Sequence, residues 1–197
     1  MRLKKYGDLF DVSQENRFDS EEAFFEKKLS DVLFITTGDG LHIRMAKKAL
    51  YLGYDIVMEK PISDKVEELQ ELVELAHKMG RKIMVCHVLR YTAMMRKLKE
   101  ILNSGAIGKL VSVDHTENVV YWHEAHSYVR GNWRNRNVAA PMIMAKCCHD
   151  LDLIQDFVGG KCSSVASMGS LAYFKPEFKP EGAADRCVNC KYVDSCT

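Results

Sequence analysis

This chain of 197 residues lacks several features that would tie it to a specialised environment. Its formal net charge is only +1, so the sequence does not indicate a charged surface for nucleic acid. No apolar run is long enough to cross a bilayer, and the basic N-terminus lacks the apolar segment of a signal peptide. We therefore expect a cytoplasmic protein that binds neither nucleic acid nor a membrane.

The cysteines do not have the pattern of a disulfide-stabilised protein. There are seven of them, an odd number, and Cys147 and Cys148 are adjacent, which favours reduced thiols. Cys187, Cys190 and Cys196 follow a C-x2-C-x5-C spacing, which is a moderate indication of a metal site. We expect free thiols here and assign no metal ligand.

The first half of the chain has the pattern of a parallel sheet with crossover helices. Helices are predicted over 1–12 and 21–29, and three apolar runs, 31–37, 54–58 and 82–86, have the character of buried strands. Helical periodicity follows the first run over 41–52, and it follows the second behind a capping-box pattern at 64–67. Strands that alternate with helices through short loops predict a doubly wound sheet.

The second half has a different pattern. A helix is predicted over 92–103, and the segments 109–118 and 163–173 each alternate apolar and polar residues as a half-buried strand does. Between these two predicted strands lie a loop-like stretch, 121–140, and a predicted helix, 141–158. The change from fully buried to half-buried strands places a domain boundary near 107, which gives domains 1–107 and 108–197.

Polar side chains gather at the ends of all three predicted parallel strands. They occupy the stretches 37–42, 59–60 and 87–91. The carboxyl ends of parallel strands share one edge of an open sheet, which is where ligands bind. We expect this convergence to mark the binding site.

Each of these motifs also has a structural interpretation. Lys60 precedes Pro61 at a strand end, so it is either a partly desolvated acid or base or one half of a surface ion pair with Glu59. The loop 37–42 has two glycines before a helix. It therefore either suits a ribose or phosphate or is a simple strand-to-helix turn.

Lys146, His149 and Asp152 recur at intervals of three in the predicted helix 141–158, so we place them near one helical face. Apolar neighbours imply that this helix is largely buried, and a buried lysine or histidine needs a partner. Proton transfer is the favoured interpretation, because histidine titrates near neutrality. Zinc binding and a hydrogen-bonded core histidine are the alternatives.

With these residues identified, the chain resembles the Gfo/Idh/MocA family of nicotinamide-dependent oxidoreductases. The segment 37–42 (TGDGLH) resembles that family's T-P-D/N-x-x-H loop, with Gly38 in place of proline, and 59–61 matches its E-K-P motif. The segment 132–134 (NWR) resembles its W-R segment, and 149–152 (HDLD) matches the later half of its D-x-G-x-H-x-x-D helix. These motifs occur in the family's order along nearly the whole chain.

The resemblance implies an α/β fold, with a partial Rossmann-type parallel sheet followed by part of an α+β C-terminal domain whose sheet is mostly antiparallel. It implies NAD or NADP as cofactor, a sugar, cyclitol or related hydroxyl compound as substrate, and a homo-oligomer as the assembly.

The resemblance also implies roles for single residues. Proton transfer would fall to Lys60, His149 and Lys146. Cofactor contacts would come from Thr36, Thr37, Asp39, His42, Glu59, Lys60, His87, Trp133 and Arg134. Substrate contacts would come from Arg90, Tyr91, Arg130 and Asp152.

Two departures from the family pattern affect what the chain can do. Ala145 occupies the position of the family's acidic residue, four before His149, so either Lys146 takes over a polar role or the group is incomplete. The family's opening strand and G-x-G-x-x-G turn have no counterpart here, and we expect a chain shortened at both ends. The predicted strand 31–37 would then have an open edge, and the site for the cofactor's pyrophosphate would be missing.

Three alternatives stay open. The chain could be a non-catalytic remnant or interaction module, which a stable, cofactor-free oligomer would favour. It could be a glycoside hydrolase that uses NAD only transiently, with no net change in the cofactor. The cysteine-rich tail could bind a metal in a structural role, which metal analysis of the purified chain would decide.

Overall fold

The computed structural model describes residues 2–196. Its contacts divide the chain into two compact units, one that ends at His87 and one that begins at Val88. The helix at 93–104, which sequence analysis assigned to the first domain, falls in the second of these units, and the domain limits at 107 and 108 stay a prediction. None of the helices within residues 2–196 is long and apolar enough to span a membrane.

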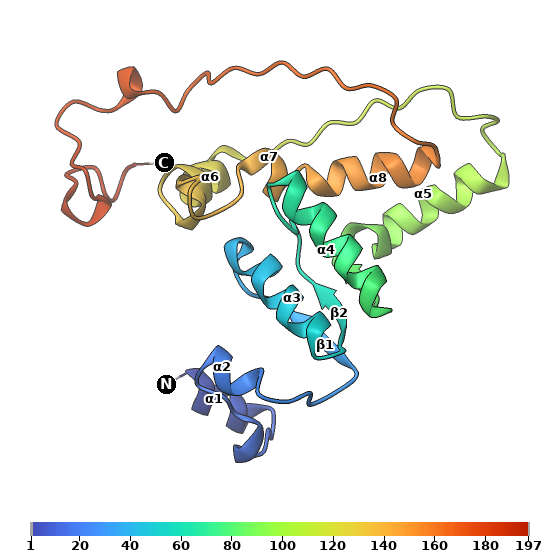
Figure 1. The fold of residues 1–197 in the computed structure, drawn as a ribbon. Helices are drawn as coiled ribbons and strands as arrows, with labels where there is room; N and C mark the ends of the chain where they lie inside the picture. Colours follow the sequence, from blue (N-terminus) through green and yellow to red (C-terminus); the bar gives the residue numbers. More distant parts are fainter. Residues whose placement is uncertain (1, 197) are drawn as a thin grey trace. The chain divides into compact units, whose positions relative to one another are not determined.

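The first unit is built on a three-stranded parallel sheet (Figure 1). The strands, in spatial order, are β1 (Val32–Ile35), β2 (Asp55–Met58) and β3 (Ile83–Val85). Ile35, Met58 and Val85 are register partners, so the three strands end at the same level. The predicted parallel sheet is confirmed, and β1 is an edge strand within the part of the chain described, as expected.

Two crossover helices, α3 (His42–Tyr51) and α4 (Val66–Met79), pack against each other and against one face of this sheet (Figure 1). They form a core with the strand residues that point toward them, among them Ile35, Ile56 and Met58. Gly80 ends α4 in the left-handed conformation, with φ of 63°. The predicted capping box at 64–67 does not form, because the helix starts later and Lys65 occupies the N-cap position without a side-chain cap.

The other face of the sheet carries exposed apolar side chains. Val32, Phe34 and Met84 are 42%, 68% and 48% exposed, whereas Ile35 and Ile56 are each 1% exposed. The expectation that these strands are buried on both faces is therefore wrong for the described residues. Two successive crossovers of the same hand place both helices on one face, and only the residues on that face are covered.

Two short helices precede the sheet, α1 (Arg2–Leu9) and α2 (Glu21–Phe24). Ser20 caps α2 as predicted, since its hydroxyl accepts a hydrogen bond from the main-chain N–H of Ala23 at 3.2 Å. The helix ends before the predicted 29. The main-chain N–H of Leu29 instead donates to the hydroxyl of the buried Tyr54 at 2.7 Å, so a side chain replaces the helical acceptor there.

The regular secondary structure of the second unit, within the described residues, consists of helices and helical turns. Its α-helices are α5 (Ala93–Ser104), α6 (Tyr121–Glu124), α7 (Met142–Ala145) and α8 (Cys148–Val158). A π-helical turn at Ala125–Val129 continues α6, and 3₁₀ turns lie at Val88–Tyr91, Asn132–Arg134, Pro176–Phe178 and Cys187–Asn189. The stretch 121–140, expected to be loop-like, is thus partly helical, and the predicted helix 141–158 is split in two.

The two strands predicted in this half, 109–118 and 163–173, are not formed. Both segments lack regular secondary structure, and Val111 and Val165 are 92% and 83% exposed. An isolated strand leaves its main-chain N–H and C=O groups without partners, so it needs a neighbour to be stable. Neither segment has a paired neighbour among the residues described.

Candidate functional site

The strand ends of the first unit bring the predicted polar residues to one edge of the sheet. The main-chain N–H of Glu59 donates to the carbonyl oxygen of Ile35 at 2.9 Å, and that of Cys86 donates to Met58 at 2.8 Å. The loops that follow the three strands therefore start side by side. The predicted convergence of the three strand ends at one edge is confirmed for this unit. The predicted site residues on or next to these loops are Thr36, Thr37, Asp39, His42, Glu59, Lys60 and His87, and their roles in binding stay predictions.

His42, the first residue of α3, links two of these loops through its buried imidazole ring. Its Nδ1 lies 2.8 Å from the carbonyl oxygen of Pro61, and its Nε2 lies 3.0 Å from that of Thr37. Both partners are acceptors, so a neutral ring satisfies one of them and an imidazolium satisfies both. Because the ring is 0% exposed, the contribution of His42 to cofactor binding would come from holding these loops in place.

Glu59 and Lys60 directly follow β2, and both are half-buried. The Glu59 carboxylate accepts a hydrogen bond from the main-chain N–H of Lys60 at 3.3 Å. Pro61 follows through a cis peptide bond and is buried. The backbone of Lys60 is thus fixed between a strand and a buried proline, at the edge where sequence analysis places the reactive amine.

The loop after β1 offers an unsatisfied polar atom at the same edge. The hydroxyl oxygen of Thr37 is buried and has no hydrogen-bond partner among residues 2–196. A buried polar group without a partner costs about 1–3 kcal/mol, so a polar ligand at this loop would remove that cost. A Cβ built on Gly38 would meet open space, and Thr36 is exposed. Asp39 begins the 3₁₀ turn that follows.

Cys86 and His87 follow β3 on the other side of Glu59. Burial, and to a lesser degree the charge of the Glu59 carboxylate, raises the pKa of the Cys86 thiol above its ordinary value. The thiol is therefore protonated and unreactive near neutral pH. His87 is half-buried, and its main-chain N–H donates to the carbonyl oxygen of Val85 at 2.8 Å.

In the second unit, two predicted substrate-binding residues pair with each other. The Arg90 guanidinium meets the Asp152 carboxylate in a fork, with Nε to Oδ2 and Nη2 to Oδ1 both at 2.6 Å, and its Nη1 lies 2.9 Å from Asp156. The hydrogen bond to Asp152, followed by the charges of both aspartates, raises the pKa of Arg90. This pair ties the turn at Val88–Tyr91 to α8. Tyr91, the last residue of that turn, is 61% exposed.

Lys146 does not share a helical face with His149 and Asp152, contrary to the prediction. It is the C-cap of α7, where its N–H donates to Met142, and its carbonyl oxygen accepts from the N–H of His149 at 3.1 Å. The helix breaks between Ala145 and Cys148 without a proline or glycine, so no residue type announces the break. His149, in the first turn of α8, and Lys146 are both half-buried.

The other predicted site residues of this unit lie on turns. Arg130 ends the π-helical turn, and its Nη1 lies 3.7 Å from the sulfur of Cys196. The ring of Trp133 is 6.3 Å from that of Tyr128, and the residue is 40% exposed. The guanidinium of Arg134 donates to a main-chain carbonyl three residues before it at 3.0 Å. Their roles in binding stay predictions.

Sequence reasoning missed a buried pair beside His149. Asp150 is 8% exposed, and its Oδ1 lies 2.6 Å from Nε2 of His115. Burial, and then the charge of Asp150, raises the pKa of the neighbouring Cys147 thiol. A buried acid in an apolar helix needs a partner, which was the available sign of this contact. The pair anchors the first turn of α8, which carries His149.

Comparisons with protein families match both parts of the chain. Residues 2–87 match the model GFO_IDH_MocA, described as "Oxidoreductase family, NAD-binding Rossmann fold". Residues 95–189 match the model GFO_IDH_MocA_C3, described as "GFO/IDH/MocA C-terminal domain". The two matches follow each other in the order that the sequence motifs predict.

Single proteins are similar over part of their length. The chain is 28% identical over 184 residues to YteT of Bacillus subtilis (strain 168), a protein named as an oxidoreductase, with 90% of this chain and 43% of YteT covered. It is 24% identical over 148 residues to the 2,7-anhydro-N-acetylneuraminate hydratase of Mediterraneibacter gnavus, with 75% of this chain and 38% of the hydratase covered.

Among solved structures, the apo scyllo-inositol dehydrogenase of Lactobacillus casei has the same fold. Its TM-score is 0.64 at 20% identity, and the match covers 80% of this chain and 44% of the dehydrogenase. The chain thus spans less than half the length of each of these three proteins.

Proposed function

The chain belongs to the Gfo/Idh/MocA family of oxidoreductases, and from this premise we propose that it takes part in hydride transfer between NAD(P) and a hydroxyl compound. The observation that carries the proposal is the convergence of Thr37, Glu59, Lys60 and His87 at the carboxyl edge of one parallel sheet. In open α/β sheets, ligands bind at this edge.

The residues of this edge fit one half of the cofactor. The buried hydroxyl of Thr37 lacks a partner in the described chain, and a ribose or carboxamide group could satisfy it. The chain contains no G-x-G-x-x-G turn, so it lacks the usual binding site for the pyrophosphate of the cofactor. We therefore assign the nicotinamide half to Thr36, Thr37, Asp39, Glu59 and Lys60. When bound, that half accepts or donates the hydride.

Lys60 is the proposed acid or base of the first unit. Its backbone is fixed at the strand end, so its amine can hold a proton at the substrate oxygen that changes between hydroxyl and carbonyl. A positioned acid or base contributes about 10²–10⁴-fold to rate. In the second unit, Lys146 and His149 are proposed to move protons as well, on the strength of the family motif.

The proposed substrate is a sugar, a cyclitol or a related hydroxyl compound. Such molecules present many hydroxyl groups, which suit the hydroxyl, guanidinium and carboxylate groups of Tyr91, Arg130 and Asp152. The fold likeness to an inositol dehydrogenase supports this class by analogy. A homo-oligomer is also proposed, because one edge of β1 has no neighbouring strand among residues 2–196 and can accept another strand.

Calorimetric titration of the purified chain with NAD(H) and NADP(H) tests cofactor binding, and the change in nicotinamide absorbance tests turnover, with Lys60→Ala and Thr37→Val as variants. Lys60→Ala should lose turnover by about 10²–10⁴-fold. Thr37→Val should weaken cofactor binding without loss of stability, since the hydroxyl has no partner to lose. Lys78→Ala, on the exposed side of α4, is the matched control. If Lys60→Ala turns over at the full rate, Lys60 is not the acid or base.

A second candidate function is a reaction with no net oxidation or reduction. The similar protein named as a hydratase favours it. Substrate would then be consumed while the absorbance of the nicotinamide returns to its starting value. Release of a free sugar in the same assay would identify a glycoside hydrolase, whereas a lasting change in nicotinamide absorbance would identify an oxidoreductase.

A further inference from the structure

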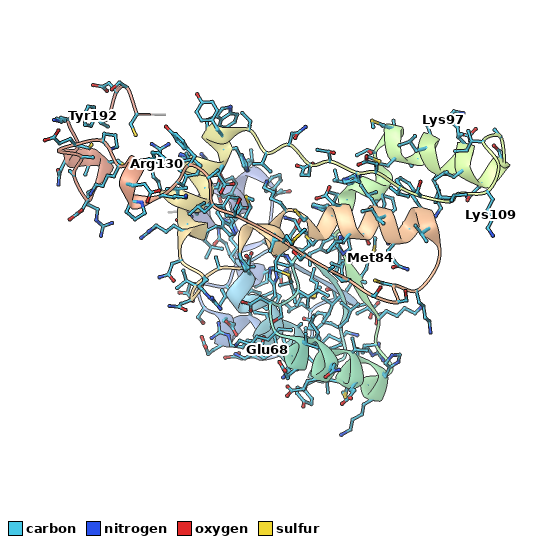
Figure 2. All side chains as sticks on the ribbon, turned by 90° about the horizontal axis from the view of Figure 1, so that it is seen from above. Glu68, Met84, Lys97, Lys109, Arg130 and Tyr192 are labelled. Atoms are coloured by element: carbon cyan, nitrogen blue, oxygen red, sulfur yellow. The ribbon has the colours of Figure 1, made fainter. Side chains whose placement is uncertain are left out.

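The second unit contains a cavity whose walls combine aromatic rings with positively charged side chains. Its volume is about 510 Å³, which is within the size range of sites for small organic molecules. The walls come from the π-helical turn, from residues 173–180 and from the last turns of the described chain. Figure 2 shows Arg130 and Tyr192 as neighbours in this part of the second unit. Six of the residues that line the cavity are Arg130, Tyr173, Lys175, Phe178, Lys179 and Tyr192.

No aspartate or glutamate lines this cavity within residues 2–196, whereas three cationic side chains do. Two of the cations have counter-ions nearby. The amine of Lys175 lies 3.6 Å from the carboxylate of Glu177, and that of Lys179 lies 3.3 Å from Asp185. Each pair is partly exposed and therefore weak, so both amines still attract an anion toward the cavity.

The third cation, Arg130, has no ion pair among residues 2–196. Its Nε donates to the main-chain carbonyl oxygen of Ala125 at 3.4 Å, and its Nη1 lies 3.7 Å from the sulfur of Cys196. A sulfur atom is only a weak acceptor, so a carboxylate can take its place. The planar guanidinium matches a carboxylate with two parallel hydrogen bonds. Arg130 therefore indicates a ligand that carries one carboxylate.

Aromatic rings form the apolar part of the wall. The rings of Tyr173 and Phe178 are nearly parallel, with an interplanar angle of 12° and centroids 6.0 Å apart. Both side chains are more than half exposed, at 63% and 53%. The hydroxyl of Tyr192 donates to the main-chain carbonyl oxygen of Glu181 at 3.0 Å, which fixes a third ring. These rings offer an apolar surface to the C–H face of a sugar ring.

We propose that this cavity binds a sugar that carries one carboxylate, such as a hexuronic acid. Arg130 holds the carboxylate, Lys175 and Lys179 add attraction, and Tyr173 and Phe178 pack against the apolar face of the sugar ring. The inference rests on the proposed function, because it narrows the sugar-like substrate of that proposal to an acidic sugar.

Calorimetric titration of the purified chain with glucuronate, without cofactor, tests the site. Glucose is the matched neutral ligand, because it has the same ring and lacks the carboxylate. The unaltered chain should bind glucuronate about tenfold tighter than glucose or more, as expected for hydrogen bonds to a charged group. Equal affinity for the two sugars, or no binding of glucuronate, overturns the proposal. This comparison needs no variant, so it does not depend on how a variant folds.

Two further ligands separate the sugar from its charge. Benzoate carries a carboxylate on an aromatic ring, and glucose 6-phosphate carries a phosphate on the same sugar. Glucuronate should bind tighter than either. If benzoate binds tighter, the cavity takes an aromatic acid, and if glucose 6-phosphate binds tighter, it takes a phosphate. Either result overturns the assignment of an acidic sugar.

Variants of Arg130 place the binding in this cavity. Arg130→Gln should weaken glucuronate binding by about tenfold or more and remove the preference over glucose. Arg130→Lys should restore only part of it, because an ammonium group does not reproduce the two parallel hydrogen bonds. Arg136→Gln is the matched control, since Arg136 is exposed and does not line the cavity. Unchanged binding in Arg130→Gln, or an equal loss in Arg136→Gln, overturns the proposal.

The outcome can be separated from that of the proposed function. Binding is measured here without NAD(P), whereas hydride transfer is read from nicotinamide absorbance. If glucuronate binds through Arg130 and no sugar changes the absorbance, the proposed function is wrong and the acidic-sugar site stands. If a neutral sugar is turned over and glucuronate does not bind, the proposed function stands and the acidic-sugar site is wrong.

Discussion

Replacing His42 with leucine should destabilise the first unit measurably, because this ring holds two loops together. Its two nitrogen atoms lie 2.8 and 3.0 Å from the carbonyl oxygens of Pro61 and Thr37, and the side chain is fully buried. Leucine fills the space but donates nothing. A buried carbonyl left without a donor costs about 1–3 kcal/mol, so a neutral ring accounts for at least about 1 kcal/mol and an imidazolium for more.

The assay should report on the first unit alone. Both tryptophans, Trp122 and Trp133, belong to the second unit, so their fluorescence does not follow the sheet. Hydrogen exchange read by mass spectrometry avoids this difficulty, since peptides from 32–61 report on the loops that His42 joins. Peptides from 121–134 serve as an internal reference. Urea unfolding followed by circular dichroism gives the free energy of unfolding, with a midpoint shift of about 0.5 M or more expected.

His77→Leu is the matched control, because His77 lies on the exposed side of α4 and a surface change there should stay within about 0.5 kcal/mol. If His42→Leu is as stable as the control and its 32–61 peptides exchange no faster than those of the original chain, the imidazole does not join the loops. The positioning role assigned to His42 would then be wrong. Faster exchange confined to 32–61 supports it.

Two further predictions concern local geometry and charge. Gly131→Ala should lower the free energy of unfolding by about 1–3 kcal/mol, because its Cβ would collide with main-chain carbonyl oxygens of the π-helical turn, whereas Gly169→Ala, with open space around it, should be neutral in thermal unfolding. Hydrogen bonds from Lys65 and Ser63 lower the pKa of Glu68, so the stability that this carboxylate contributes is present above its unfolded pKa and is lost as pH falls through the folded pKa. Glu68→Gln should therefore be less stable than the original chain at neutral pH and equally stable in acid, as measured by urea unfolding across pH.

The parallel sheet could be predicted because short stretches of the sequence mark each of its strands and helices. Each strand is a short apolar run, and each helix has a periodic apolar stripe and an end marked by a glycine such as Gly53 or Gly80. The carboxyl edge followed from chain order alone, since parallel strands with crossovers must end at the same side. That is why Glu59, Lys60 and His87 were correctly expected to share an edge.

The second unit was predicted less well because its contacts join residues far apart in sequence. The fork between Arg90 and Asp152 spans 62 positions, and the pair of His115 with Asp150 spans 35. Periodicity carries no information about such partners. The predicted strands at 109–118 and 163–173 failed for a related reason, since alternation marks a segment that can form a strand but does not provide the neighbour that stabilises it.

A ligand smaller than NADH can test whether this chain binds only the nicotinamide half of the cofactor. The sheet edge with Thr37 and Lys60 is proposed to bind the nicotinamide half of a dinucleotide, whereas a glycine-rich turn at a helix N-terminus usually holds the pyrophosphate. The 197 residues contain no such turn. If this edge alone binds, reduced nicotinamide mononucleotide and NADH should have similar dissociation constants in the same calorimetric titration. If NADH binds more than about tenfold tighter, a difference of about 1.4 kcal/mol in binding free energy, other residues must bind the adenosine half of the dinucleotide.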